Sequence, residues 1–443
     1  MKSGRDRAAK RQKHTHGKPM KGTKRQLASA GRKDKNIRSD CYVELTISRR
    51  GGISIELSSK VDALYGGSIR ALVKDVLLTM SVEHAAVSIE DRGAVPFVIA
   101  ARVEAAAKRA LPERNQAYLL HRSSRRKTSA KNRLRRTRLY LPGNDPRFFL
   151  NAGLHTPDCI ILDLEDSVAP GEKDTARILV RNALRTVDFG TAERMVRINS
   201  GKIGMEDIRE VIPHGVETIL IPKCESATEV SAVADLVTSL RDQMLIRQEV
   251  YLLPIIESAR GVLNASSIAS SELVCGLAIG LEDYCADIGV QRTREGKESA
   301  FARGAVVNAA CAAGVQPLDS VFSDVADLSA LRMSAAESKT LGFKGIGCIH
   351  PRQIHVVHDV FTPNESEILK AQRVVLAFED AKRSGGGVVA LGSKMIDMPV
   401  VLQALQTVSL GETLGLIGRN WRAKAERVEA DLDLKEEGNA EQS

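Results

Sequence analysis

The chain has 443 residues, of which 43% are hydrophobic, and a formal net charge of +9. The charge is uneven: residues 1–38 sum to +12 and residues 112–137 to +8, so the remainder carries −11. An acidic body with two basic segments argues against a protein that wraps nucleic acid with one positive face. No apolar run approaches the ~18 residues of a membrane helix, and no apolar signal core follows the N-terminus, so we expect a cytoplasmic protein. Seven cysteines without a CxxC pair indicate reduced, buried thiols.

The N-terminal part reads as a tail followed by a small domain. Residues 1–37 are rich in Lys, Arg and Gly and poor in apolar residues, which predicts a disordered basic tail. Residues 38–111 predict a small α+β domain with strands at 41–47, 53–57, 86–90 and 96–100 and helices over 68–80 and up to 111. Ser68 is the expected N-cap of the first helix. Gly51 and Gly52 predict a hairpin turn between the first two strands.

The centre of the chain has a different pattern. Residues 112–137 are basic and predict a solvated linker. Short apolar runs separated by helix-length segments follow, at 138–142, 159–165, 195–199, 218–223, 250–257, 274–281, 317–322 and 345–350. Continuous apolar strands suit a parallel sheet covered on both faces. Eight of them alternating with helices predict an α/β fold, a (β/α)₈ TIM barrel over residues 138–383.

The C-terminal part predicts an appendage to the barrel. A helix is expected over 365–383, and the glycines at 385–387 then break the chain. We expect residues 384–428 to form a helical lid, or an arm that reaches a neighbouring subunit, with helical spacing over 399–410. Residues 429–443 predict a charged tail.

Ionisable residues follow most of the predicted barrel strands, where the catalytic groups of such barrels lie. Glu257 and Asp283 follow successive strands, so both can point into one mouth. Two carboxylates that leave room for water and substrate oxygens suit Mg²⁺. The alternative is that Glu257 caps the helix after it.

Arg197 ends another of these strands. Its planar, permanently charged guanidinium suits a substrate carboxylate. The alternative is an ion pair with Asp163 or Asp166.

From about residue 138 to 407 the sequence resembles the citrate lyase β chain and its relatives, the malyl- and citramalyl-CoA lyases of the HpcH/HpaI aldolase superfamily. The ordered motifs are RLYLPGN at 138–144, DLEDSV at 163–168, EKD at 172–174, VRIN at 196–199, IES at 256–258, GLEDY at 280–284, IHPRQ at 349–353 and KMIDMP at 394–399. The resemblance implies that Glu257 and Asp283 bind Mg²⁺ and that Arg197 binds substrate. Asp397 would be an acid/base placed into a neighbouring subunit's site.

The same resemblance assigns Asn144 and Glu282, with Glu257, to substrate contacts and Arg138 to cofactor binding. It also implies a homo-oligomer, a trimer or a hexamer, and the citrate lyase α subunit as a candidate partner.

Residues 38–111 resemble a second family, the acyl-carrier γ chain of citrate lyase, through DCYVEL at 40–45, SIRALV at 68–73, EDRGA at 90–94 and ARVEA at 101–105. In that family a serine just before the first strand carries a phosphoribosyl-dephospho-CoA arm. An ungapped alignment puts Arg38 at that position and Ser39 one place later. Ser39 is therefore the candidate attachment site, and the alternative is that it merely opens the strand.

Together the two resemblances predict a Mg²⁺-dependent lyase that cleaves a citryl thioester, on a carrier or on CoA, to oxaloacetate and an acetyl thioester. The alternative is a malyl-CoA or citramalyl-CoA lyase with a vestigial carrier domain. A third reading takes the basic tail as a polyanion-binding arm. The tail has no interleaved aromatic residues, so stacking on bases is not indicated.

Overall fold

The computed structural model describes residues 26–34, 36–122, 129–383, 389–391 and 394–423. The chain forms two compact units. The first comprises residues 41–118 with the described residues before Arg38, and the second comprises residues 38–40 and those from Leu119 onward.

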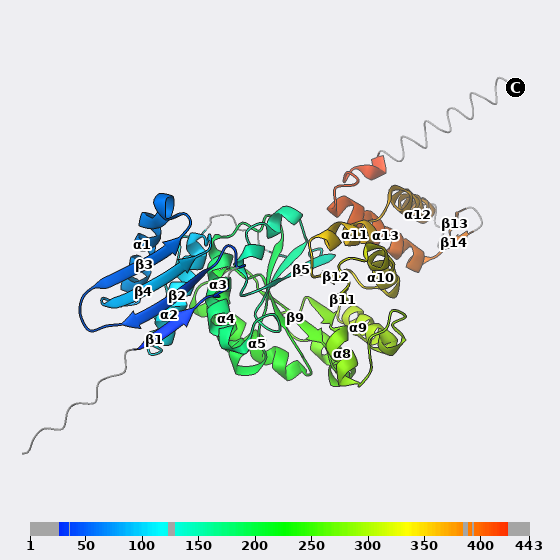
Figure 1. Ribbon diagram of the computed structural model, residues 1–443. Helices are drawn as coiled ribbons and strands as arrows, with labels where there is room; N and C mark the ends of the chain where they lie inside the picture. Colours follow the sequence, from blue (N-terminus) through cyan, green and yellow to red (C-terminus); the bar gives the residue numbers. More distant parts are fainter. Residues whose placement is uncertain (1–25, 35, 123–128, 384–388, 392–393, 424–443) are drawn as a thin grey trace, which may run out of the picture. The chain divides into compact units, whose positions relative to one another are not determined.

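The first unit is a four-stranded sheet with two helices (Figure 1). Its elements are β1 (Leu27–Ala30), β2 (Cys41–Ile47), β3 (Ile53–Ser59), α1 (Asp62–Thr79), β4 (Ala85–Asp91) and α2 (Pro96–Ala110). The strand order is β1-β2-β4-β3; β3 and β4 are parallel and the other two pairs are antiparallel. Alternate residues of β2 are buried, as expected for a sheet with one face covered by helices.

Several predictions for this unit were wrong. Strand β4 lies between β2 and β3, so Gly51 and Gly52 do not close a hairpin; β3, α1 and β4 form a parallel crossover instead. Helix α1 begins at Asp62, before the predicted Ser68, and continues through Gly66 and Gly67.

Gly66 lies beside a half-exposed ion pair on that helix. A Cβ on Gly66 would lie 1.7 Å from the Asp62 carboxylate, which is paired with Arg70.

Two further corrections concern the ends of the same unit. The predicted strand at 96–100 is the start of α2, with Pro96 in the first turn, where its missing N–H costs nothing. Strand β1 lies within the segment predicted to be a disordered tail, because it pairs with β2 from Leu27 to Ala30. Residues 1–25 of that tail lie outside the described residues.

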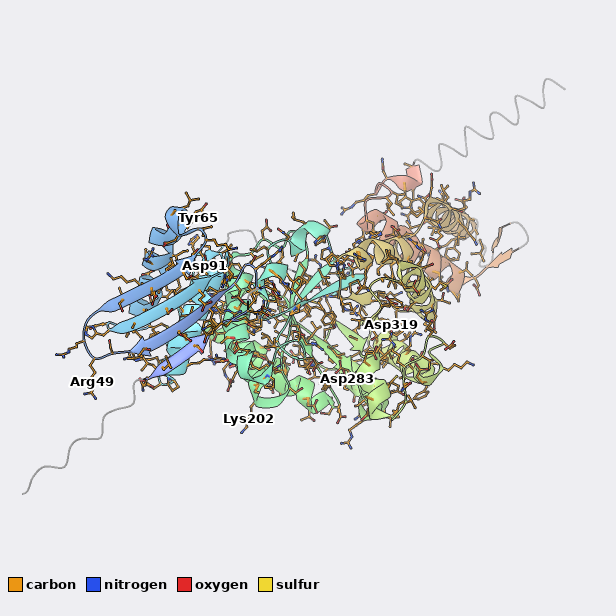
Figure 2. All side chains as sticks on the ribbon, in the orientation of Figure 1. Arg49, Tyr65, Asp91, Lys202, Asp283 and Asp319 are labelled. Atoms are coloured by element: carbon orange, nitrogen blue, oxygen red, sulfur yellow. The ribbon has the colours of Figure 1, made fainter. Side chains whose placement is uncertain are left out.

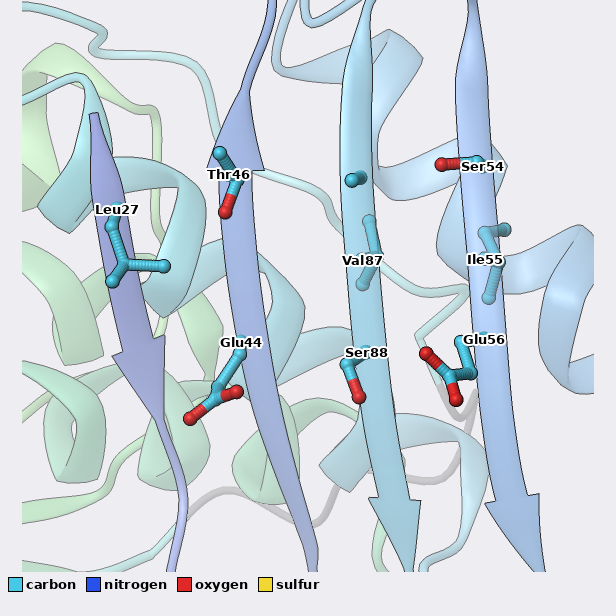
Figure 3. A pocket seen from close by; sticks show the side chains of 9 residues that line it. Leu27, Glu44, Thr46, Ser54, Ile55, Glu56, Val87 and Ser88 are labelled. Atoms are coloured by element: carbon cyan, nitrogen blue, oxygen red, sulfur yellow. The ribbon is translucent and has the colours of Figure 1, made fainter. Parts of the chain in front are cut away.

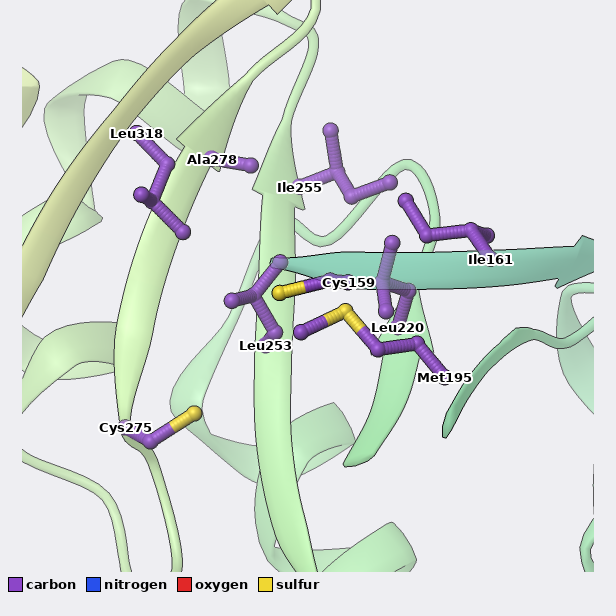
Figure 4. Close-up of a cluster of buried hydrophobic side chains, with 9 residues drawn as sticks. All are labelled: Cys159, Ile161, Met195, Leu220, Leu253, Ile255, Cys275, Ala278 and Leu318. Carbon is purple, nitrogen blue, oxygen red and sulfur yellow. The ribbon is translucent and has the colours of Figure 1, made fainter. Parts of the chain in front are cut away.

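The second unit is a closed eight-stranded parallel barrel, the predicted TIM barrel. Its strands are β5 (Thr137–Pro142), β6 (Cys159–Asp163), β7 (Glu193–Arg197), β8 (Thr218–Ile221), β9 (Tyr251–Ile256), β10 (Gly276–Ile279), β11 (Gln316–Val321) and β12 (Ile346–Cys348). Side chains from β6 to β11 fill the interior with a buried apolar cluster (Figure 4), whose members include Cys159, Met195 and Leu318. The barrel is therefore a packed core with a mouth, as this fold requires.

Helices surround the barrel (Figure 1). They are α3 (Lys173–Thr186), α4 (Gly201–Val211), α5 (Ala227–Gln243), α6 (Ala259–Leu263), α7 (Ala265–Ala269), α8 (Leu281–Asp287), α9 (Ala300–Ala312), α10 (Leu328–Leu341) and α11 (Arg352–Phe361). Short 3₁₀ helices are η1 (Pro146–Phe148), η2 (Ala152–His155), η3 (Pro170–Glu172), η4 (Ile212–His214) and η5 (Lys297–Ser299).

The predicted solvated linker at 112–137 is partly buried, which corrects that prediction. Arg135 is 1% exposed and donates to both Glu193 oxygens at 2.8 and 2.9 Å. Ser129 and Thr218 also donate to Glu193, at 2.6 and 2.7 Å. The prediction failed because the acidic partner of Arg135 lies 58 positions later in the chain, outside the basic segment.

After the barrel come α12 (Glu365–Arg383), as predicted, then β13 (Val389–Leu391), β14 (Lys394–Ile396) and α13 (Met398–Thr413). Helices α12 and α13 share a buried apolar cluster that includes Val375, Val401 and Trp421. The glycines at 385–387 and the tail at 429–443 lie outside the described residues.

All seven cysteines are described and unbridged; six are buried, as predicted, whereas Cys311 is exposed. Within the described residues, no helix is both long and apolar enough to cross a membrane.

Candidate active site

A cavity of about 430 Å³ opens where the barrel strands end. It combines apolar residues with a dense set of ionisable ones, and Figure 2 labels Asp283 and Asp319 on this part of the barrel. The ionisable residues that line it are Arg138, Tyr140, Asp163, Asp166, Arg197, Glu257, Glu282, Asp283 and Asp319.

Arg197, at the end of β7, is held by carboxylates. Its Nε and Nη2 donate to Asp163 at 2.7 and 2.8 Å, and its Nη1 lies 2.9 Å from Glu165 and 3.3 Å from Asp166. The guanidinium also lies over the ring of Tyr140, 5.5 Å from its centroid. Burial alone would raise the pKa of Asp163, but its bonds to Arg197 outweigh burial and lower that pKa. The ion pair considered as an alternative is thus present, and it fixes the guanidinium at the cavity wall.

Lys223 joins the same cluster from the segment after β8. Its Nζ lies 2.7 Å from Glu165 and 3.3 Å from Asp166, which raises the pKa of this lysine. Its backbone has φ = +49°, the left-handed region that non-glycine residues seldom adopt, and its N–H donates to Glu257 at 3.2 Å. Strain of this kind is typical of functional sites.

Glu257 directly follows β9, lines the cavity and is 5% exposed. Burial and the nearby negative charge of Asp283 raise the pKa of Glu257 to about 7. A Cβ on Gly280 would lie 2.6 Å from its carboxylate, so glycine is needed where this side chain packs against β10. The helix-cap alternative for Glu257 is wrong, because Ser258 caps α6 by accepting from the Gly261 N–H at 3.1 Å.

Glu257 and Asp283 have the chemistry of a hard-cation site. Among the described residues, no group of three or more His, Cys, Asp or Glu side chains could hold a metal ion. A pair of carboxylates whose mutual repulsion raises one pKa, in a cavity with room for other oxygen ligands, fits Mg²⁺, which keeps several waters. The pair fits zinc less well, because zinc prefers histidine and cysteine ligands.

The other predicted residues are placed differently. Glu282 lines the cavity and pairs with Arg292 at 2.8 Å. Asn144 is half-buried in the turn after β5 and is not one of the cavity-lining residues. Asp397 is exposed, caps α13 by accepting from the Val400 N–H at 3.4 Å, and does not line this chain's cavity.

The sequence predicted no role for Glu165 or Lys223. Their shared ion pair needs β6 and β8 to be brought together, so sequence spacing could not reveal it.

A second hollow, of about 320 Å³, lies on the sheet of the first unit (Figure 3). Its polar lining includes Glu44, Glu56 and Thr46, and no basic residue lines it. The barrel mouth, with both signs of charge, is therefore the stronger candidate for catalysis.

Comparisons with known proteins identify the family of the barrel. Residues 136–351 match the family model described as HpcH/HpaI aldolase/citrate lyase. Citrate lyase subunit beta of Leuconostoc mesenteroides is 38% identical over 289 residues, which cover 64% of this chain and 96% of that protein. The chain belongs to this family. It is a carbon–carbon lyase.

Two further relatives are a citramalyl-CoA lyase and a CitE protein of known structure. The mitochondrial citramalyl-CoA lyase of Homo sapiens is 33% identical over 63% of this chain and 86% of its own length. A crystal structure of CitE from Mycobacterium tuberculosis, in complex with magnesium, acetoacetate and coenzyme A, superposes with a TM-score of 0.52 and 30% identity. The match covers 62% of this chain and 98% of that one.

This lyase also has a carrier-like domain. Residues 37–110 match the family model described as malonate decarboxylase delta subunit (MdcD). Ser39 lies two residues before β2, is half-buried and has φ = +57°. This serine therefore lies outside regular structure, directly before the first strand of the matched domain.

Proposed function

We propose that this lyase cleaves a citryl thioester to oxaloacetate and an acetyl thioester. The observation that carries the proposal is the barrel mouth, where the Glu257 and Asp283 carboxylates and the Arg197 guanidinium line one cavity. Support also comes from the citrate lyase β relative, which aligns over almost its whole length. The carrier-like N-terminal domain supports chemistry on a thioester rather than on a free acid.

Each residue of the cavity has a proposed role in this cleavage. Glu257 and Asp283 would hold Mg²⁺, which when bound polarises the oxygen that becomes the ketone. Arg197, fixed by Asp163 at 2.7 Å and supported by Tyr140, would bind a substrate carboxylate at its Nη1–Nη2 edge, where Glu165 and Asp166 now pair with Nη1. The hydroxyl loses its proton, the adjacent C–C bond breaks, and its electron pair forms the enolate of the acetyl thioester, which is then protonated.

Asp397 of a neighbouring subunit is the candidate for the proton transfer. It is exposed on the C-terminal segment and does not line its own chain's cavity. The proposal therefore includes a homo-oligomer, a trimer or a hexamer. Mixing subunits that carry Asp397→Asn with subunits that carry Asp283→Asn should restore part of the activity, because mixed oligomers contain some intact sites. Mixtures as inactive as either variant alone would contradict the shared site.

Ser39 is the proposed attachment point of a CoA-derived arm, and a citrate lyase α subunit is the proposed partner. Intact-mass measurement of the protein from its own host should show an increment that maps to Ser39. An unmodified Ser39 in active protein would favour free CoA thioesters as substrates.

The second candidate is cleavage of citramalyl-CoA or malyl-CoA, which the identity to human citramalyl-CoA lyase favours. One assay separates the candidates. Purified protein with Mg²⁺ is given citryl-CoA, citramalyl-CoA and malyl-CoA in turn. Oxaloacetate is detected with malate dehydrogenase, and pyruvate or glyoxylate with lactate dehydrogenase. We expect the highest kcat/KM with citryl-CoA. Cleavage of only the other two thioesters would replace the proposal with the second candidate.

A further inference from the structure

Arg138 is a buried cation at the cavity with much of its hydrogen-bonding capacity unused. It lies on β5 beside Cys159 of the interior cluster, is 1% exposed and lines the cavity. Its Nη2 donates to the Asp319 backbone carbonyl at 2.6 Å. Within the described part of the chain, neither its Nε nor its Nη1 has a hydrogen-bond partner.

The Asp319 carboxylate does not pair with the unused donors of Arg138. Asp319 Oδ2 accepts from Arg303 and from Ser338, both at 2.7 Å. Its Oδ1 accepts from the Ser320 N–H at 2.9 Å. Asp319 is therefore committed to Arg303, and its contact with Arg138 is through the main chain.

A buried guanidinium with unpaired N–H donors lowers the stability of the folded protein. Removing a charge from water is unfavourable unless it is paired and hydrogen-bonded, and each unsatisfied buried donor adds to the cost. Burial lowers the pKa of Arg138, as expected for a cation without its full complement of partners. An anion entering the cavity would supply the missing partner for the Nε and Nη1 donors.

We propose that Arg138 binds the second free carboxylate of the substrate and so selects substrates that release a dicarboxylic oxo acid. The inference rests on the proposed function. A citryl thioester has two free carboxylates, whereas malyl and citramalyl thioesters have one. Arg138 and Arg197 line the same cavity, and both act on Tyr140, so we place one free carboxylate of a citryl thioester at each guanidinium.

The test is the binding of the released oxo acids to the full chain with Mg²⁺, measured by isothermal titration calorimetry. Oxaloacetate has two carboxylates and pyruvate has one. We expect the wild type to bind oxaloacetate at least ~10-fold more tightly, the effect of a charge-assisted hydrogen bond in a buried site. Arg138→Met should reduce the ratio to about threefold or less, with pyruvate affinity unchanged. Equal affinities in the wild type would overturn the inference without any variant.

The melting temperature is a second measurement. It should fall in Arg138→Met if Arg138 is a structural residue, and it should stay the same or rise if Arg138 serves to bind a ligand. Without ligand, Arg138→Met should melt at or above the wild-type temperature, because an apolar side chain of similar length replaces a poorly paired buried cation. The matched variant Arg135→Met should melt lower, because it leaves Glu193 buried and unpaired. If Arg138→Met also melts much lower and keeps the oxaloacetate preference, Arg138 is a structural residue and the inference is wrong.

The experiments distinguish a failure of the proposed function from a failure of the proposed role of Arg138. A wild type that does not cleave citryl-CoA but loses its oxaloacetate preference in Arg138→Met refutes the proposed function alone. A wild type that cleaves citryl-CoA, with an Arg138→Met variant that keeps the preference, refutes only the role of Arg138. Should Arg138→Met not fold, Arg138→Gln is measured in its place.

Discussion

Two buried arginines of the barrel, Arg135 before β5 and Arg138 within it, are hydrogen-bonded to very different extents. Before β5, Arg135 donates to both oxygens of Glu193, and Ser129 and Thr218 complete the carboxylate's hydrogen bonds. Three residues later, Arg138 faces the cavity with Nε and Nη1 unpartnered among the described residues. Both arginines are 1% exposed.

This difference shows that burial alone does not indicate what a charge is for. A buried ion pair with all its hydrogen bonds made holds the fold together, and removing one partner is strongly destabilising. A buried charge with donors left over, at the wall of a cavity, is prepared for a ligand. The Arg135–Glu193 pair at the closed end is thus structural, whereas the charges that line the cavity are available for chemistry.

The largest effect is expected at the mouth. Asp283→Asn should lower kcat by about 10³-fold or more, because a neutral amide is a poor ligand for Mg²⁺ and polarisation of the substrate oxygen is lost. Steady-state turnover at saturating Mg²⁺ tests this. Asp235→Asn, at an exposed position of α5 that does not line the cavity, is the control and should keep wild-type turnover. Full activity of Asp283→Asn would refute the metal site.

At the closed end the effect should fall on stability instead. Glu193→Gln removes the charge that pairs with Arg135 and should destabilise the barrel by about 3–5 kcal/mol. The midpoint of urea unfolding measures this change. Glu249→Gln breaks an exposed pair with Arg241 and should cost about 1 kcal/mol or less. Equal urea midpoints for the two variants would show that the Arg135–Glu193 pair stabilises the fold no more than an exposed pair does.

Arg197→Lys should reduce kcat/KM by about 10- to 100-fold, because an ammonium cannot keep both bonds to Asp163 and also present a planar fork to the substrate. Arg177→Lys, in a pair with Asp207 outside the cavity, is the matched control. An unchanged kcat/KM in Arg197→Lys would leave Arg197 as a purely structural ion pair.

The smallest effect concerns His214 in η4, just before β8. Burial, and then the charges of Arg181, Arg185 and Arg122, lower its pKa to about 3, so the folded protein keeps this imidazole neutral. The unfolded chain binds the proton below about pH 6.5. The stabilising contribution is therefore present above pH 6.5 and is lost as the pH falls toward 3. At pH 5 the loss is about 2 kcal/mol.

His214→Gln should make the melting temperature less sensitive to pH between 7.5 and 5, whereas His355→Gln, at an exposed position, should not. Parallel pH profiles for the wild type and His214→Gln would exclude this role.

Much of the fold could be predicted because its signals are local. The apolar runs located all eight barrel strands, and the acids after them located Glu257 and Asp283 at one mouth. Where a local signal was ambiguous the prediction failed. Residues 96–100 are apolar enough for a strand, but they begin α2 after Pro96, and Gly66 and Gly67 hid the first turns of α1.

The sequence by itself determined the barrel, its acidic rim and the carrier-like domain, since periodicity and composition act within a few residues. Only the tertiary structure decided which charges were satisfied. Residues 112–137 were predicted to be a solvated linker, yet Arg135 pairs with Glu193, 58 positions away. Among the residues that the structure describes, the hydrogen-bond acceptor of Arg138 is a main-chain oxygen 181 positions away. The cost of a buried charge depends on partners that closure of the barrel brings together, and no local pattern records them.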